Sequence, residues 1–218
     1  MSIKSKVLAT AATMTMVGGL SAVGLLPAHA STPSCVDCVS PYGAEYSTGF
    51  VLDVLRQGEK AGQPIILFRA SNSDPAEDFN ILDNDTVAGY YASGLVSERL
   101  NYNYSNDEAY VVEYSPYGVD SGLCIGVAST PGNGTPVVLE PCAVNSNTIW
   151  VVDNEDAGNG YPWINASTTN FADPFVLHYP GNAYPTDMPR AQLNTWGLQE
   201  YSSGDVFDNE MWYGLSGS

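Results

Sequence analysis

The amino-acid sequence predicts an all-β protein in which one strand pattern recurs three times. Pro, Gly, Asn, Asp and Ser punctuate the chain at short intervals, and the segments between them are rich in Val, Ile, Leu, Tyr and Phe. This composition is typical of many short strands joined by turns. No stretch longer than two turns has the apolar spacing of an amphipathic helix. The candidate strands are residues 50–54, 64–68, 100–104, 109–114, 123–127, 136–139, 148–152, 175–179 and 191–196.

The three repeats begin near residues 49, 122 and 174, and each is apolar at the same four positions of its first strand. Each then passes through a Gly- or Pro-containing turn to a second apolar strand and on to a large aromatic residue, which is Phe79, Trp150 or Trp212. One repeat is too small to bury its own apolar face. The sequence therefore predicts a threefold fold that closes around a shared core.

The first thirty residues have the features of a secretory signal peptide. Lys4 and Lys6 form a basic start, residues 7–26 are almost wholly small and apolar, and Ala28-His29-Ala30 provides an A-x-A cleavage site. A retained anchor helix fits less well, because this stretch contains glycines and lacks a basic stop-transfer flank. We therefore expect residues 1–30 to be removed and the protein to be secreted and extracellular.

The charge balance excludes two classes of partner. The chain of 218 residues has 7 Lys and Arg against 24 Asp and Glu, a formal net charge of −17. Nucleic acids and anionic lipid surfaces are bound through Lys and Arg, so neither is an expected partner. No apolar run after residue 30 is long enough to cross a bilayer, so membrane insertion is not expected either.

After the signal, residues 31–48 form an N-terminal segment and residues 49–218 a single domain. The N-terminal segment contains Cys35 and Cys38. An exported protein is expected to oxidise its cysteines, and four of them allow three pairings. We interpret Cys35 and Cys38 as a small disulfide ring, because a redox or zinc motif would need a context that this sequence lacks.

The second repeat resembles the ricin B-type lectin family in three stretches. These are the sequences CIGV at 124–127, VLEPC at 138–142 and NTIW at 147–150. The resemblance implies a β-trefoil domain, a disulfide between Cys124 and Cys142, and carbohydrate binding. The Tyr-rich segments, residues 185–190 and the Trp212 ending also resemble an uncharacterised group of small secreted actinobacterial proteins.

One interval departs from the regular spacing of such repeats. The first two repeat starts lie farther apart than the second and third. Residues 80–121 therefore contain an insertion, which we expect to be a hairpin of 100–104 and 109–114 together with the 89–98 stretch.

The resemblance also implies where a sugar would bind. In the first repeat, Asp53 occupies the family's sugar-binding Asp position, Phe68 stands where a stacking aromatic is usual, and Glu77 stands in the place of an amide. A locally bonded strand carboxylate remains an equal alternative for Asp53. The second repeat has Gly126 and Glu140 at corresponding positions, and we interpret it as structural.

In the third repeat, His178 replaces the Asp. Trp196 and Asn209 could still contribute to a site there.

Catalytic and metal sites are not evident in the sequence. His178 is the only histidine outside the signal, no Gly-x-Ser-x-Gly motif accompanies it, and no glycosidase pair stands out among the carboxylates. The acidic stretches 74–78, 83–85 and 153–156 do not fit the twelve-residue calcium loop, so we interpret them as solvated turns. No catalytic residue, metal or cofactor is predicted, although a glycoside hydrolase is not excluded.

The function that we predict is a secreted, non-catalytic, lectin-like module that binds a carbohydrate or glycan. The alternative is a protease inhibitor or protein-interaction scaffold on the same fold. In that alternative, Arg99 in the segment 97–100 would lie on an exposed extended loop and enter a trypsin-like pocket. A protein partner is also compatible with the 14 Tyr residues, because Tyr can bury its ring while its hydroxyl stays in water.

Overall fold

The structure is a computed structural model that describes residues 40–41, 50–71, 74–153, 161–179, 190–195 and 212–213. The expected signal peptide, the Cys35 and Cys38 ring, Trp196 and Asn209 lie outside these residues. No helix in the described part of the chain is long and apolar enough to cross a membrane.

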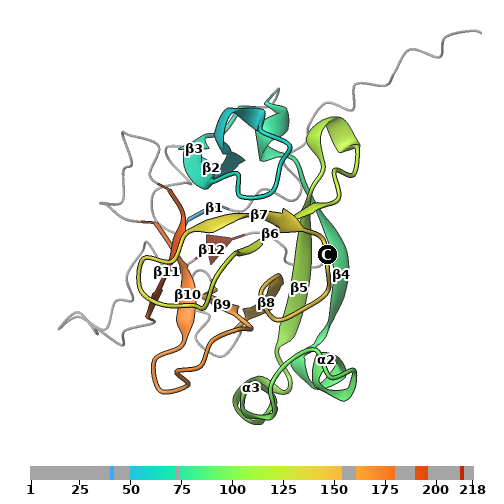
Figure 1. Cartoon of the computed structure of the whole chain (residues 1–218), viewed down its shortest axis with the longest axis vertical. Helices are drawn as coiled ribbons and strands as arrows, with labels where there is room; N and C mark the ends of the chain where they lie inside the picture. Colours follow the sequence, from blue (N-terminus) through green and yellow to red (C-terminus); the bar gives the residue numbers. More distant parts are fainter. Residues whose placement is uncertain are drawn as a thin grey trace, which may run out of the picture.

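The described residues form mainly strands, which are connected by short turns (Figure 1). The strands are β1 (Ser40–Pro41), β2 (Phe50–Val54), β3 (Ile65–Arg69), β4 (Phe79–Thr86), β5 (Glu108–Tyr114), β6 (Leu123–Val127), β7 (Val137–Pro141), β8 (Ile149–Val152), β9 (Trp163–Asn165), β10 (Phe175–His178), β11 (Gln192–Thr195) and β12 (Trp212–Tyr213). The helices are α2 (Val87–Ala92) and α3 (Glu98–Tyr104), with 3-10 turns η1 (Leu55–Gln57), η2 (Pro75–Glu77) and η3 (Pro116–Gly118).

Three hairpins, β2–β3, β6–β7 and β10–β11, carry the three repeat starts. Isolated bridges join each hairpin to the next, namely Pro64 to Val138, Ile66 to Arg190 and Pro136 to Gln192. The other strands pair in the succession β4–β5–β8–β9. A bridge links Tyr161, just before β9, to Trp212 of β12, and β12 pairs with β1. This threefold arrangement is the one that the repeats predict.

In the second and third repeats, the tryptophan near the end of the repeat donates a hydrogen bond to a carbonyl of that repeat's first strand. The Trp150 Nε1–H donates to the Ile125 carbonyl at 3.0 Å, and the Trp212 Nε1–H donates to the Leu177 carbonyl at 2.9 Å. Both indoles are fully buried. In the first repeat the corresponding residue is Phe79, which has no N–H to donate.

The insertion after β4 is helical, so the prediction of a strand at 100–104 was wrong. Ser97 Oγ accepts the Leu100 N–H at 3.1 Å and Thr86 Oγ1 accepts the Gly89 N–H at 3.2 Å. Such N-caps favour helix starts. Leu100 is fully buried while Tyr102 is 85% exposed, which fits helical rather than strand periodicity because residues i and i+2 of a strand share one face.

The same finding changes the interpretation of Arg99. The segment 97–100 begins α3, and the Arg99 guanidinium lies 5.7 Å from the centre of the Phe171 ring. It is therefore not the extended loop that the protease-inhibitor alternative requires.

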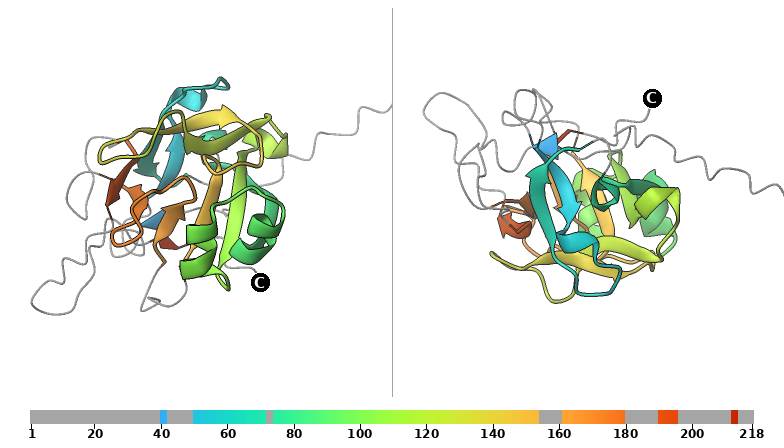
Figure 2. Two further views of the ribbon diagram at one scale, coloured as in Figure 1. Left: turned by 60° about the horizontal axis from the view of Figure 1, so that its bottom comes forward. Right: turned by 90° about the horizontal axis from the view of Figure 1, so that it is seen from above.

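The helices cover the outer face of the barrel strands. β5 is buried on both faces, because Tyr110, Val112 and Tyr114 point into the central core. Ala109 and Val111 point outward into a second core beneath α2 and α3. Figure 2 shows the helices beside β4 and β5, away from the β2–β3 hairpin.

A disulfide between Cys124 and Cys142 lies at the edge of the second core. It is the pairing that the family resemblance implies, and it ties the two strands of the β6–β7 hairpin together.

Candidate functional site

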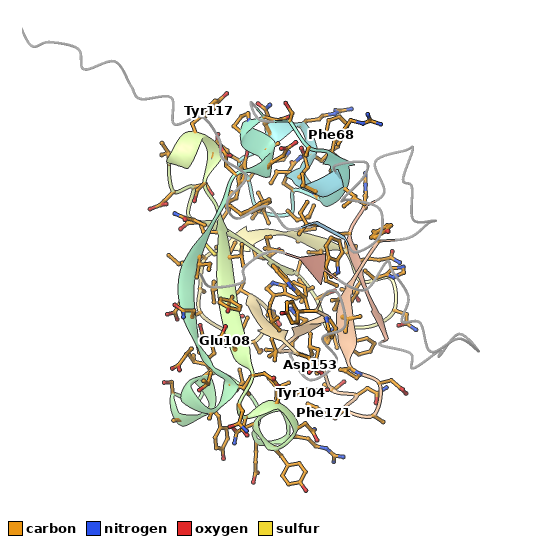
Figure 3. All side chains as sticks on the ribbon, turned by 180° about the vertical axis from the view of Figure 1, so that it is seen from behind. Phe68, Tyr104, Glu108, Tyr117, Asp153 and Phe171 are labelled. Atoms are coloured by element: carbon orange, nitrogen blue, oxygen red, sulfur yellow. A yellow bond between two sulfur atoms is a disulfide. The ribbon has the colours of Figure 1, made fainter. Side chains whose placement is uncertain are left out.

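The candidate site lies on the outer face of the β2–β3 hairpin. Asp53 is paired with Ile66, and Val51 is paired with Phe68. Alternate residues of the hairpin, including Leu52 and Leu67, point into the core, so Asp53 and Phe68 share the opposite face. Phe68 is half-buried. Figure 3 places it at the opposite end of the molecule from Tyr104 and Phe171.

The short turn η2 brings two more carboxylates to this face. Pro75 occupies its first position, where a missing N–H is harmless. Asp74 Oδ1 accepts the Ala76 N–H at 3.0 Å and Gln57 Nε2–H at 2.9 Å. The backbone N–H of Ser71 donates to both carboxylate oxygens of Glu77 at 2.9 Å.

These bonds tie η2 to Gln57 of η1 and to Ser71. One carboxylate oxygen from each of Asp53, Asp74 and Glu77 lies within 4.8 Å of the others.

Asp53 is the least satisfied member of this group. Its side chain is 3% exposed and accepts no hydrogen bond from the residues that the structure describes. Burial, followed by the charges of Asp74 and Glu77, raises the pKa of Asp53 from 3.8 to about 7. Burial is also the largest cause that raises the pKa of Glu77 from 4.5 to about 7, and the Ser71 N–H partly opposes it.

The hydroxyl of Tyr114, whose side chain points into the central core, is also unsatisfied among the described residues. Tyr114 is fully buried, and its Oη has no hydrogen-bond partner in the described part of the chain. Its pKa is raised first by burial and then by the negative charges of Glu59, Asp53, Asp74 and Asp78. A buried polar atom without a partner costs about 1–3 kcal/mol, so the Tyr114 hydroxyl would gain from a hydrogen-bond partner.

The corresponding positions of the other repeats differ. At Gly126 an added Cβ would lie 3.1 Å from the Asn147 carbonyl oxygen, so this position has little room for a side chain. His178 is 9% exposed and its ring stacks against Tyr179, with the centroids 6.5 Å apart. Trp196 and Asn209, the other expected residues of the third repeat, lie outside the described residues.

The structure thus brings Asp53, Glu77 and Phe68 to one hairpin face and its adjoining turn, and adds Asp74, which the sequence analysis treated as part of a solvated turn. The signal for Asp74 was the Asp-Pro pair at the start of η2, because Asp is a favoured N-cap and Pro a favoured first helical residue. Tyr114 gave no comparable signal. Chemically, the group can accept hydrogen bonds from hydroxyls or coordinate a cation.

Comparisons with known proteins define the fold class. No protein-family model matches the chain, and no curated protein matches it. Among solved structures, the chain is similar to ThreeFoil, a designed threefold-symmetric protein, with 16% identity, a TM-score of 0.53, and coverage of 81% of this chain and 94% of that one. It is also similar to the Rhizoctonia solani agglutinin, with 18% identity, a TM-score of 0.51, and coverage of 82% and 94%.

These likenesses, at low sequence identity, are likenesses of fold. They confirm the predicted β-trefoil fold.

Proposed function

We propose that the protein is an exported, non-catalytic, carbohydrate-binding module, and that a sugar binds on the outer face of the β2–β3 hairpin. The observation that carries this proposal is the placement of Asp53, a buried acceptor without a described donor, on the same face as the half-buried ring of Phe68.

Sugars need the two kinds of contact that this face offers. A carboxylate accepts hydrogen bonds from hydroxyl groups, and the apolar side of a pyranose can lie on an aromatic ring, which provides a large apolar face. The fold is shared with an agglutinin, which supports the same class of function. Export is proposed from the signal-like residues 1–30.

The site would recognise sugars without the usual amide pair. Ala76 and Glu77 stand in its place, and Glu77 is already bound to the Ser71 N–H. We therefore expect recognition to depend mainly on Asp53 and on the ring of Phe68.

The test is a glycan array with the protein lacking residues 1–30, followed by titration of any bound glycan. We expect Phe68→Ala to weaken binding at least tenfold. Tyr102→Ala is the matched control, because Tyr102 is an exposed aromatic on α3 and its loss should leave binding unchanged. Absence of binding to every glycan, or equal binding by Phe68→Ala and the parent protein, would refute the proposal.

A further inference from the structure

We propose that the sugar site on the β2–β3 hairpin extends across η2 to Tyr117, and that it takes a linear, uncharged polysaccharide chain rather than a single terminal sugar. This inference rests on the proposed carbohydrate-binding function and deepens it, because it adds a second aromatic contact and names the class of glycan.

Tyr117 has a strained backbone and an exposed ring. Its φ is 57°, in the left-handed region that a bulky residue rarely adopts. The next residue, Gly118, has a φ of 71°, but glycine adopts this conformation without strain. The Tyr117 side chain is 73% exposed, so burial of the ring does not offset the strain. Backbone strain of this kind gathers at ligand-binding sites, which indicates a role for Tyr117 outside the core.

The strained positions in the described part of the chain all adjoin η2. The non-glycine residues with a positive φ there are Arg56, Gln57 and Tyr117. The Gln57 side chain donates to Asp74, the N-cap of η2, at 2.9 Å. The Tyr117 N–H donates to Oδ2 of Asp78, the C-cap of the same turn, at 3.0 Å. The two capping carboxylates thus hold one strained loop at each end of η2.

The turn η2 also links the loop of Tyr117 to the candidate sugar site. It packs against both β2 and η3, and its residue Glu77 has a carboxylate oxygen within 4.8 Å of one from Asp53. Figure 3 shows Tyr117 and Phe68 at the same end of the molecule, toward opposite sides of it. A ligand that contacts both rings must therefore contain several sugars in a row.

The charge around η2 favours an uncharged chain. Asp74 and Asp78 cap the two ends of the turn, and the whole protein has a formal net charge of −17. This negative field repels uronic acids and sulfated sugars. A neutral polysaccharide offers hydroxyls to the carboxylates and the apolar faces of its sugar rings to Phe68 and Tyr117.

The experiment begins with affinity electrophoresis of the protein lacking residues 1–30. The gels contain a neutral polysaccharide (xylan, mannan, laminarin or starch) or an acidic one (alginate or pectin). We expect at least one neutral polysaccharide and neither acidic one to retard the protein. Isothermal titration then uses the mono- to hexasaccharides of each polysaccharide that retards it, and we expect the affinity to rise with the number of sugars.

Two substitutions of Tyr117 separate the ring from the backbone. Tyr117→Gly removes the ring and places at this position the residue that best adopts a positive φ, so it should be at least as stable as the parent protein in thermal melts. It should bind the hexasaccharide about tenfold more weakly and the monosaccharide as the parent does. Tyr117→Phe retains the ring and should bind both sugars as the parent does. Tyr102→Ala is the matched control, because Tyr102 is 85% exposed but lies in the helix α3.

The outcomes distinguish this inference from the proposed function. Equal hexasaccharide binding by Tyr117→Gly and the parent protein would overturn the inference alone. So would an affinity that does not increase beyond one sugar, retardation by the acidic polysaccharides, or binding on the glycan array without retardation by any neutral polysaccharide. Absence of binding both in the gels and on the array would refute the proposed function, and the inference with it.

Discussion

The hydrogen bond from Trp150 to the Ile125 carbonyl should contribute measurably to the stability of the barrel. Leu139 on β7 is paired with Ile125 but does not donate to it. Its N–H donates to the Gln63 carbonyl, and its carbonyl accepts the Gly62 N–H. The Ile125 carbonyl therefore relies on the indole. Trp150→Phe removes the donor from a fully buried ring. The orphaned carbonyl should cost about 1–3 kcal/mol, in addition to the cavity left by the smaller ring.

Trp163 provides a matched comparison within the same core. It is fully buried, its ring centroid is 6.5 Å from that of Trp150, and its Nε1–H has no acceptor among the residues that the structure describes. Trp163→Phe removes the same volume but no hydrogen bond, so the cavity contributions nearly cancel when the two variants are compared.

Urea and thermal unfolding of the two variants give the difference directly. We expect Trp150→Phe to be less stable than Trp163→Phe by about 2 kcal/mol, which corresponds to about 4–8 °C in Tm for a chain of this size. Equal stabilities, or a less stable Trp163→Phe, would refute the assignment of the stabilisation to the indole hydrogen bond.

Three further predictions concern the disulfide, the acidic group and the helical insertion. Cys124→Ser should lower the free energy of unfolding by about 3 kcal/mol, because the disulfide closes a loop over a sequence separation of 18; a reduced urea midpoint checks this. Stability should fall by about 2–4 kcal/mol as the pH rises from about 4 to 7, because the raised pKa values let folded Asp53 and Glu77 keep protons that the unfolded chain releases. Asp53→Asn should reduce this fall in thermal melts at several pH values, and a stability that increases over this range would contradict the argument. Ser97→Ala should cost about 1 kcal/mol by removing the N-cap of α3, and denaturant unfolding without any such loss would exclude a stabilising role for the cap.

Much of the fold follows from patterns that are visible in the chain. The strand predictions at 50–54 and 123–127 match β2 and β6, because both are short apolar runs that directly follow a glycine. The prediction at 100–104 failed because Leu-Asn-Tyr-Asn-Tyr alternates as a strand does, whereas the N-cap at Ser97 favours the helix that forms there. β12 was missed because a strand of two residues is too short to show an alternating pattern. Its position depends on pairing with β1 from a distant part of the chain.

The candidate site could be predicted only in part. Asp53 and Phe68 follow from the register of one hairpin, which the repeat pattern already contains. Asp74 comes close to Asp53 only because the turn η2 lies beside β2 in the folded chain. The burial of the Tyr114 hydroxyl depends on the packing of β5 against the core. Such convergence between elements leaves no periodic signature in a sequence. The pKa shifts of Asp53 and Glu77 likewise arise from burial rather than from residue type.

The pairing of β1 with β12 has a consequence for the order of folding. Ser40 lies opposite Tyr213, so the first described strand finds its partner only after almost the whole chain has been made. Contacts between residues so distant in sequence form slowly, because the intervening chain must be ordered first. During synthesis, the β2–β3 and β6–β7 hairpins can form early, while β1 remains without a partner until the last repeat emerges. Premature termination anywhere in that repeat would therefore leave an open sheet edge rather than a smaller barrel, and open edges are prone to aggregate.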